Sequence, residues 1–205
     1  MDEIRNRILS GANDLFMRYG VKSVTMDDIA SQLSVSKKTI YSNFKDKDDL
    51  VNNVCFTHME SEKIEVAEIE SSSANTVEEL YKLTIYLRKM FQDMNPAVLF
   101  DIKKYHPQAF KIYEDHKEFC TKNVVAKNLK KGIEEGYFRE NIDPDVLAIM
   151  RIHQMEWAFD RSYFSQLENY DFTHIQLQLF EHFVRGVMTP KGIELYNHYI
   201  SENEK

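Results

Sequence analysis

The scarcity of turn-forming residues is the feature that most constrains the fold of this chain. It holds six glycines in 205 residues, and its four prolines, at positions 96, 107, 144 and 190, all lie in the second half. Antiparallel sheets need turn residues at short intervals, and this sequence does not supply them. Apolar residues instead recur every three or four positions, which is typical of amphipathic helices. We therefore expect an all-α protein.

Composition narrows the class of protein further. Hydrophobic residues make up 43% of the chain, which excludes a disordered protein. No uncharged apolar stretch reaches the ~18–20 residues of a membrane span, and the start Met1-Asp2-Glu3 lacks the basic and apolar segments of a secretion signal. Cys55 and Cys120 give neither a disulfide framework nor metal-site spacing. The sequence thus predicts a cytoplasmic protein without membrane contact, metal or cofactor.

Capping residues and breakers set the expected helix boundaries. Gly20 ends the first amphipathic helix, because glycine takes the left-handed conformation after a last turn. Thr25 and Asp28 have nearly the spacing of a capping box. Gly11 lies inside the first helix, where we expect another helix to approach closely. The expected helices cover 2–19, 25–33, 37–44, 47–70, 77–93, 95–105, 107–135, 144–167, 171–189 and 191–200.

The two short helices at 25–33 and 37–44 form a helix-turn-helix arrangement around a three-residue turn. Ile40 and Phe44 define the inward side of the second helix, so its outward side carries lysines and small hydroxyls. Such side chains suit base edges and phosphates. A helix about 10–12 Å wide also fits the roughly 12 Å major groove of DNA. This segment therefore predicts DNA binding.

The charge distribution supports a local site in an acidic protein. The net charge is −7, yet Lys37, Lys38, Lys45 and Lys47 face a single acid, Asp46, across residues 31–47. A short basic segment in an otherwise acidic chain is typical of a local contact with nucleic acid. The alternative is a solvated helix surface, which is how most lysine clusters are used.

The stretch from Thr25 to Leu50 resembles the DNA-binding motif of the TetR family of bacterial transcriptional regulators. The matching residues are Thr25, Ile29, Ala30, Val35, Ser36, Thr39, Ile40, Tyr41, Phe44, Lys47 and Leu50. The resemblance implies a DNA-binding domain over 1–47 and a helical effector-binding and dimerisation domain over 48–205. It also implies that operator DNA is contacted by Thr25, Ser36, Lys37, Lys38, Thr39, Tyr41, Ser42 and Lys47.

One position departs from the family pattern. Ser34 stands in the turn where the family usually has glycine. A serine that takes the left-handed conformation there carries a strain of ~1 kcal/mol. The family's usual mode is repression, and by that analogy we expect a repressor.

The carboxy-terminal part contains twelve aromatic residues between positions 91 and 164. Most of them are expected in a helical core. The resemblance implies an effector pocket among these helices, and an apolar or aromatic small molecule suits such a lining better than a phosphorylated one. The candidate pocket residues are Phe91, Met94, Tyr113, Phe119, His153 and Trp157.

The helix at 171–189 carries an apolar stripe wider than one packing contact needs. We expect it to pair, together with the helix before it, with the same helices of a second subunit. A two-fold dimer would present its recognition helices to successive major grooves and read a near-palindromic site. The predicted interface residues are Ile175, Leu179, Phe183 and Val187.

Two other classes of function remain as alternatives. An enzyme is disfavoured because the sequence contains no nucleophile elbow, P-loop, dinucleotide fingerprint or zinc-hydrolase motif. His153 and Glu156, at i and i+3, form a pair that binds metal in some proteins but is usually surface chemistry. A helical protein-interaction or ligand-binding module without DNA binding is the second alternative, and the acidic net charge mildly favours it.

Overall fold

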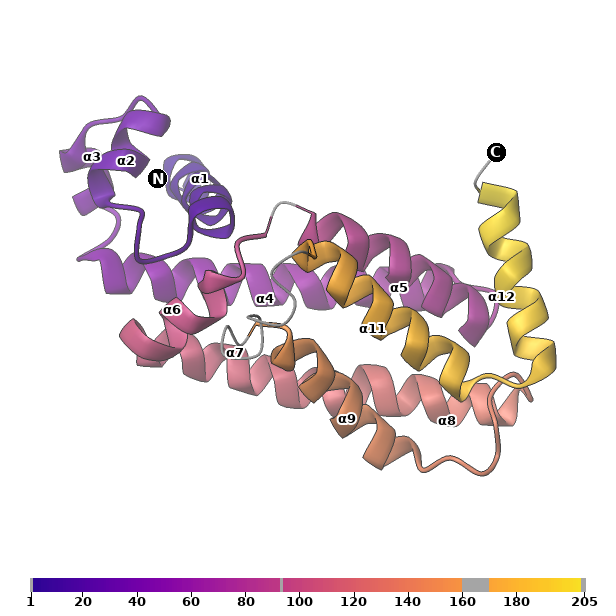
Figure 1. Ribbon diagram of the computed structural model, residues 1–205. Coiled ribbons are helices and arrows are strands. Elements are labelled where there is room, and N and C mark those ends of the chain that lie inside the picture. The colour runs from indigo at the N-terminus through magenta and orange to yellow at the C-terminus, as the bar shows by residue number, and fades with distance from the viewer. Residues whose placement is uncertain (1, 93, 160–169, 204–205) are drawn as a thin grey trace. The chain divides into compact units, whose positions relative to one another are not determined.

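The computed structural model describes residues 2–92, 94–159 and 170–203, and these are helical apart from short connections and an isolated bridge between Phe138 and Met188. The all-α prediction is confirmed. The helices are α1 (Asp2–Tyr19), α2 (Met26–Gln32), α3 (Lys37–Tyr41), α4 (Lys47–Ser72), α5 (Thr76–Phe91), α6 (Ala97–Tyr105), α7 (Pro107–Phe119), the π-helix η1 (Cys120–Ala126), α8 (Lys127–Glu134), α9 (Pro144–Trp157), α11 (Phe172–Val187) and α12 (Pro190–Asn203) (Figure 1).

The chain divides into two compact units. The head unit comprises residues 1–63 and 93–116, and the bundle unit comprises residues 64–92 and 117–205. The domain boundary expected after residue 47 falls inside the head unit, because Leu50 and Val54 of α4 are buried in its core. The helix α4 therefore begins in the head unit and ends in the bundle unit.

The head unit is built on close packing of α1 against α2 and the start of α4. Ile8, Ala12 and Phe16 of α1 are buried in one core with Ile29 of α2. The close approach expected at Gly11 is present, because a Cβ there would lie 2.5 Å from Cδ2 of Leu33. Gly20 follows the last residue of α1 with a φ of +82°, as its position in the sequence predicts.

The helix α3 is shorter than expected. The sequence pattern predicts a helix over 37–44, whereas α3 ends at Tyr41. The side chains of Ser42 and Asn43 both donate to the carbonyl of Thr39, each over 2.8 Å, and compete with the helical backbone bonds. Phe44 remains buried beyond the end of the helix, so the inward side is preserved.

The segment 107–135 departs from the expectation. One long α-helix is predicted there, but a π-helix, η1, separates α7 from α8. Thr121 and Asn123 donate from their side chains to the carbonyls four residues back, of Lys117 and Phe119. These bonds compete for carbonyls that an α-helix would use. Other helix ends differ from the prediction by a few residues, as helix ends commonly do.

The core of the bundle unit lies on one side of α11. Figure 1 shows α11 beside α5 and α9, and α11 is in contact with both. Phe180 and Val184 of α11 are buried with Leu80 of α5 and Leu129 of α8. The predicted helix at 144–167 is observed as α9 up to Trp157, and its last part lies outside the described residues.

Candidate nucleic-acid interface

The turn between α2 and α3 is closed by its own backbone. The amide of Ser34 donates to the carbonyl of Ser31 over 3.1 Å, and the amide of Val35 donates to that of Ala30 over 3.0 Å. These two bonds are the Schellman pattern, which requires a left-handed residue after the last turn. Ser34 is that residue, with a φ of +53°. The turn thus keeps a left-handed residue, although serine stands where the family usually has glycine.

Capping side chains fix the start of both helices. Thr25 forms a capping box at the start of α2, in which its hydroxyl accepts from the amide of Asp28 and its own amide donates to the carboxylate of Asp28. The hydrogen bonds from Thr25 hold the pKa of Asp28 below its ordinary value. Ser36 caps α3, since its Oγ accepts from the amide of Thr39 over 3.0 Å.

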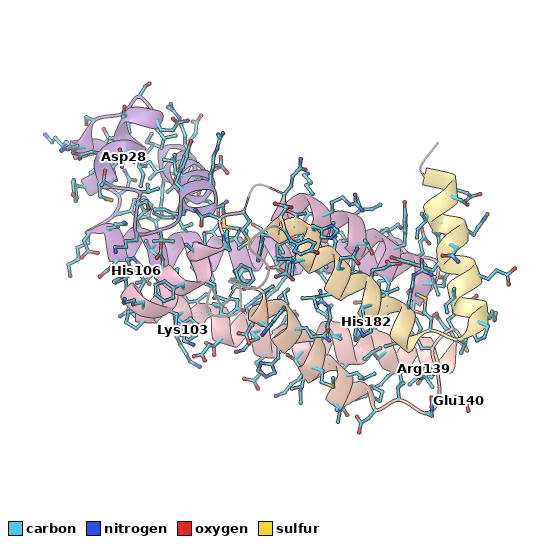
Figure 2. All side chains as sticks on the ribbon, in the orientation of Figure 1. Asp28, Lys103, His106, Arg139, Glu140 and His182 are labelled. Carbon is cyan, nitrogen blue, oxygen red and sulfur yellow. The ribbon has the colours of Figure 1, made fainter. Side chains whose placement is uncertain are left out.

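The helix α3 presents one apolar and one polar side. Ile40 has no exposed surface and Phe44 is buried beside it. Lys37, Lys38 and Tyr41 are exposed on the other side, and the Tyr41 side chain retains 52% of its accessible surface. Figure 2 shows Asp28 on the neighbouring α2, within the same head unit. This arrangement leaves the polar side of α3 open to a partner.

Several of the predicted contact residues have partners within the head unit. Lys37 Nζ lies 2.6 Å from Asp27 Oδ1 on α2. The Thr39 hydroxyl lies 2.8 Å from that of Ser36. Lys47 Nζ donates to the carbonyl of Val21 over 2.6 Å, and burial lowers the pKa of Lys47.

These contacts divide the predicted set into two kinds. Lys37, Lys38 and Tyr41 of α3 and Ser42 directly after it are exposed, and Lys37 also forms an ion pair. The hydroxyls of Thr25, Ser36 and Thr39 serve as caps or bond to a cap. Lys47 belongs to neither kind, because it binds the loop between α1 and α2 near the start of that loop.

Sequence reasoning missed Arg5, which fixes the end of α3 to α1. Its guanidinium donates to the carbonyl of Asn43 over 3.0 Å and to Oδ1 of Asn53 over 2.6 Å. The same group lies 4.4 Å from the centre of the Phe44 ring. These contacts join residues 38 to 48 positions apart, and no local spacing indicates them.

The candidate effector residues do not all belong to one unit. Met94 and Tyr113 lie in the head unit, whereas Phe91, Phe119, His153 and Trp157 lie in the bundle unit. Phe91 is buried, and its ring packs edge-on against Phe159 and Phe172. His153 is exposed and its Nδ1 lies 3.2 Å from Glu156 Oε2. Within the described part of the chain, no three potential ligands are grouped to hold a metal ion.

The predicted dimer residues also differ in exposure. Ile175 and Val187 are buried within the single chain, Val187 in the core of the bundle unit, so they offer little surface to a second subunit. Leu179 and Phe183 are half-buried. The stripe is wide because its inner part already packs within the chain.

A short helix with a buried back, an open polar front and a capped turn before it defines a helix-turn-helix DNA-binding protein. A family model described as "Bacterial regulatory proteins, tetR family" matches residues 8–54. The uncharacterized HTH-type transcriptional regulator YvaF of Bacillus subtilis is 31% identical over 159 residues, which cover 77% of this chain and 82% of YvaF. The chain belongs to the TetR family: it is a DNA-binding transcriptional regulator and not an enzyme.

Other relatives and solved structures agree with this assignment. The transcriptional repressor KstR2 of Mycobacterium tuberculosis is 24% identical, over 78% of this chain and 80% of its own length. A TetR-family regulator from Agrobacterium tumefaciens has the same fold, with a TM-score of 0.77 at 15% identity, over 92% of this chain and 99% of its own. The structure of a regulator from Saccharomonospora viridis in complex with choline has a TM-score of 0.72 at 20% identity, over 92% of this chain and 100% of its own.

No described helix is long and apolar enough to cross a membrane.

Proposed function

We propose that this protein is a repressor that binds a near-palindromic operator as a homodimer and is released by a small apolar or aromatic effector. The observation that carries the proposal is the open polar side of α3, with Lys38 and Tyr41 exposed opposite the buried Ile40. In this proposal Lys37, Lys38, Tyr41 and Ser42 face base edges and phosphates in the major groove. Thr25, Ser36 and Thr39 hold the helices that present them.

An exposed apolar stripe on α9 supports the dimer. Val146, Ile149, Met150 and Trp157 stand at i, i+3, i+4 and i+11 on one side of the helix, and each keeps between 38% and 52% of its accessible surface. Large apolar residues gathered on one exposed face typically mark an interaction site. We place the dimer interface on this stripe together with Leu179 and Phe183 of α11, which is in contact with α9. A two-fold interface then brings two recognition helices to one duplex.

The helix α4 supplies the proposed coupling between effector and operator. Its residues 47–63 belong to the head unit and its residues 64–72 to the bundle unit. An effector changes DNA affinity if it prefers one spacing of the two recognition helices over another. A tilt of α4 changes that spacing, and a coupling of ~1–3 kcal/mol produces a switch of roughly 5–150-fold.

Selection of bound duplexes from a random DNA pool tests the operator part of the proposal. We expect a near-palindromic site whose half-sites are about one helical turn apart or a multiple of it. The variant Lys38→Ala/Tyr41→Ala should bind that site at least 10-fold more weakly with unchanged circular dichroism. Lys122→Ala/Tyr170→Ala, which removes an equally exposed lysine and tyrosine from the bundle unit, is the matched control. Equal binding by both variants would contradict the proposed interface.

A further inference from the structure

The bundle unit buries a cation for which the described chain provides no anion. Arg151 of α9 retains 4% of its accessible surface. Its guanidinium lies 5.0 Å from the centre of the Phe180 ring and 6.0 Å from that of Phe183. Its Nη1 has no hydrogen-bond acceptor among the described residues, and none of their carboxylates forms an ion pair with it. Attraction to the two rings offsets part of the cost of burying this charge.

Burial lowers the pKa of Arg151 to about 10, with no charged group among its causes. The side chain therefore keeps its proton at neutral pH. A guanidinium that stays charged and lacks an acceptor is a group that an anion from outside the chain can satisfy.

A second buried polar group, the Gln176 amide, bonds to α9 one helical turn after Arg151. Gln176 of α11 is 1% exposed, and its Nε2 donates to the carbonyl of Met155 over 2.9 Å. Its Oε1 is buried without a donor. Gln176 precedes Phe180 by one turn on α11, and Met155 follows Arg151 by one turn on α9. The contacts Arg151–Phe180 and Met155–Gln176 therefore show that α9 and α11 run antiparallel here. Both unsatisfied groups lie where these two helices face each other, which we call the α9–α11 stretch.

Farther from Arg151, the same stretch is lined by aromatic rings. The rings of Phe159 and Phe172 lie 4.8 Å apart, and Phe91 lies 5.6 Å from Phe172. Phe159 follows Arg151 by eight residues, and Phe172 precedes Phe180 by eight. The eight steps from Phe172 to Phe180 lie within α11 and span roughly 12 Å, and Phe159 lies two residues beyond the end of α9. The α9–α11 stretch therefore has a cation, Arg151, at one end and aromatic rings at the other. The distance between the two ends matches the length of a medium-sized amphiphilic molecule.

We propose that the effector of this regulator is an amphiphilic carboxylate, whose carboxylate pairs with Arg151 and whose apolar chain extends toward Phe91, Phe159 and Phe172. This inference rests on the proposed release of the protein by a small effector. It places that effector in the bundle unit and replaces a purely apolar molecule by one that also carries a carboxylate. A carboxylate matches the planar fork of one guanidinium. A phosphate dianion would leave one charge unmatched, because Arg151 is the single buried cation that the described part of this stretch supplies.

The test compares decanoate with 1-decanol, which has the same chain without the charge. Binding is measured by calorimetry without DNA, on the wild type, Arg151→Met and Arg185→Met. The last variant removes an exposed cation from α11 and is the control. We expect decanoate to bind the wild type and Arg185→Met at least 10-fold more tightly than decanol. In Arg151→Met the preference should disappear, while decanol affinity stays within about twofold.

A thermal melt without ligand gives an independent readout. Replacing an unpaired buried cation by an apolar side chain of similar length should raise the melting temperature of Arg151→Met. A lower melting temperature would mean that Arg151 is a structural group and would overturn the proposal. Equal binding of decanoate and decanol to the wild type, or no decanoate binding at millimolar concentration, would overturn it without need of any variant.

Two further results separate this proposal from its alternatives. If Arg151→Met sediments as a monomer while the wild type is a dimer, a carboxylate of the second subunit is the partner of Arg151 and the ligand proposal fails. Operator affinity is measured separately by gel shift. If decanoate binds through Arg151 but leaves operator affinity unchanged, the carboxylate site stands and the effector role proposed above fails.

Discussion

Lys37 Nζ lies 2.6 Å from Asp27 Oδ1, so the first lysine of the recognition helix is paired with an acid of the preceding helix. Both side chains keep 60% of their surface, and the pair is exposed to solvent. DNA phosphates must compete with Asp27 for this lysine. We therefore expect Asp27→Asn to raise operator affinity by about 3–10-fold, because it frees Lys37 and removes a charge that repels phosphate.

The salt dependence of binding checks the cause of that gain. Asp27→Asn should steepen the slope of log affinity against log salt by up to about one unit, since one more phosphate contact releases counterions. Asp115→Asn is the matched control, because Asp115 pairs at 2.7 Å with Lys111 on α7 and is equally exposed. If both variants gain equally, the effect comes from net charge and not from Lys37.

Ser34 in its left-handed conformation gives a prediction on stability. Ser34→Gly should raise the free energy of unfolding by ~1 kcal/mol, because glycine takes this conformation without steric cost. Urea unfolding followed by circular dichroism measures the change. Ser31→Gly, on the adjacent exposed turn of α2, should lower stability by up to ~1 kcal/mol, since glycine is unfavourable inside a helix. A loss of stability in both variants would contradict the strain at Ser34.

The capping box gives a prediction on pH. Thr25→Val removes the largest cause of the lowered Asp28 pKa, so that pKa should rise toward its ordinary value but stay below it, because the Thr25 amide still donates. An NMR titration of Asp28 measures this shift. Loss of the N-cap should also cost ~1 kcal/mol of stability at pH 7. Thr57→Val, at an exposed position inside α4, is the control and should change neither quantity appreciably.

The sign of the pH dependence follows from the direction of the shift. The pKa of Asp28 is lower in the folded state, so the capping box stabilises the head unit above the unfolded pKa of about 4. This stabilisation is lost as pH falls through the folded pKa. The acid-induced loss should be smaller in Thr25→Val than in the wild type.

Local features of this fold could be predicted from the sequence. The caps at Thr25 and Ser36 and the stop at Gly20 each depend on residues within five positions of one another. The inward side of α3 follows from the spacing of Ile40 and Phe44. Such features are decided by backbone chemistry that a short window contains.

Long-range contacts could not be predicted in the same way. The bond from Lys47 to the Val21 carbonyl and the bond from Arg5 to the Asn43 carbonyl arise only when the head unit packs. The early end of α3 depends on two side chains that compete for the Thr39 carbonyl. Periodicity predicted Ile175 on a dimer surface, and its burial within the single chain depends on how α11 packs against α5 and α9.

The exposed stripe on α9 gives the last prediction, which concerns the oligomeric state. Ile149 keeps 52% of its surface, so Ile149→Glu should leave the fold of one protomer unchanged. In a dimer built on this stripe the glutamate would be buried without a partner, a change that typically costs several kcal/mol. Sedimentation at micromolar concentration should then show a monomer.

Loss of the dimer should also weaken binding to a palindromic operator by about 100-fold or more, because the second half-site is then no longer held at high effective concentration. Ile85→Glu is the matched control, since Ile85 on α5 of the same unit is 51% exposed. It should remain a dimer and bind DNA as the wild type does. A dimer that persists in Ile149→Glu would place the subunit interface elsewhere, and the exposed apolar residues of α9 would then face a different partner.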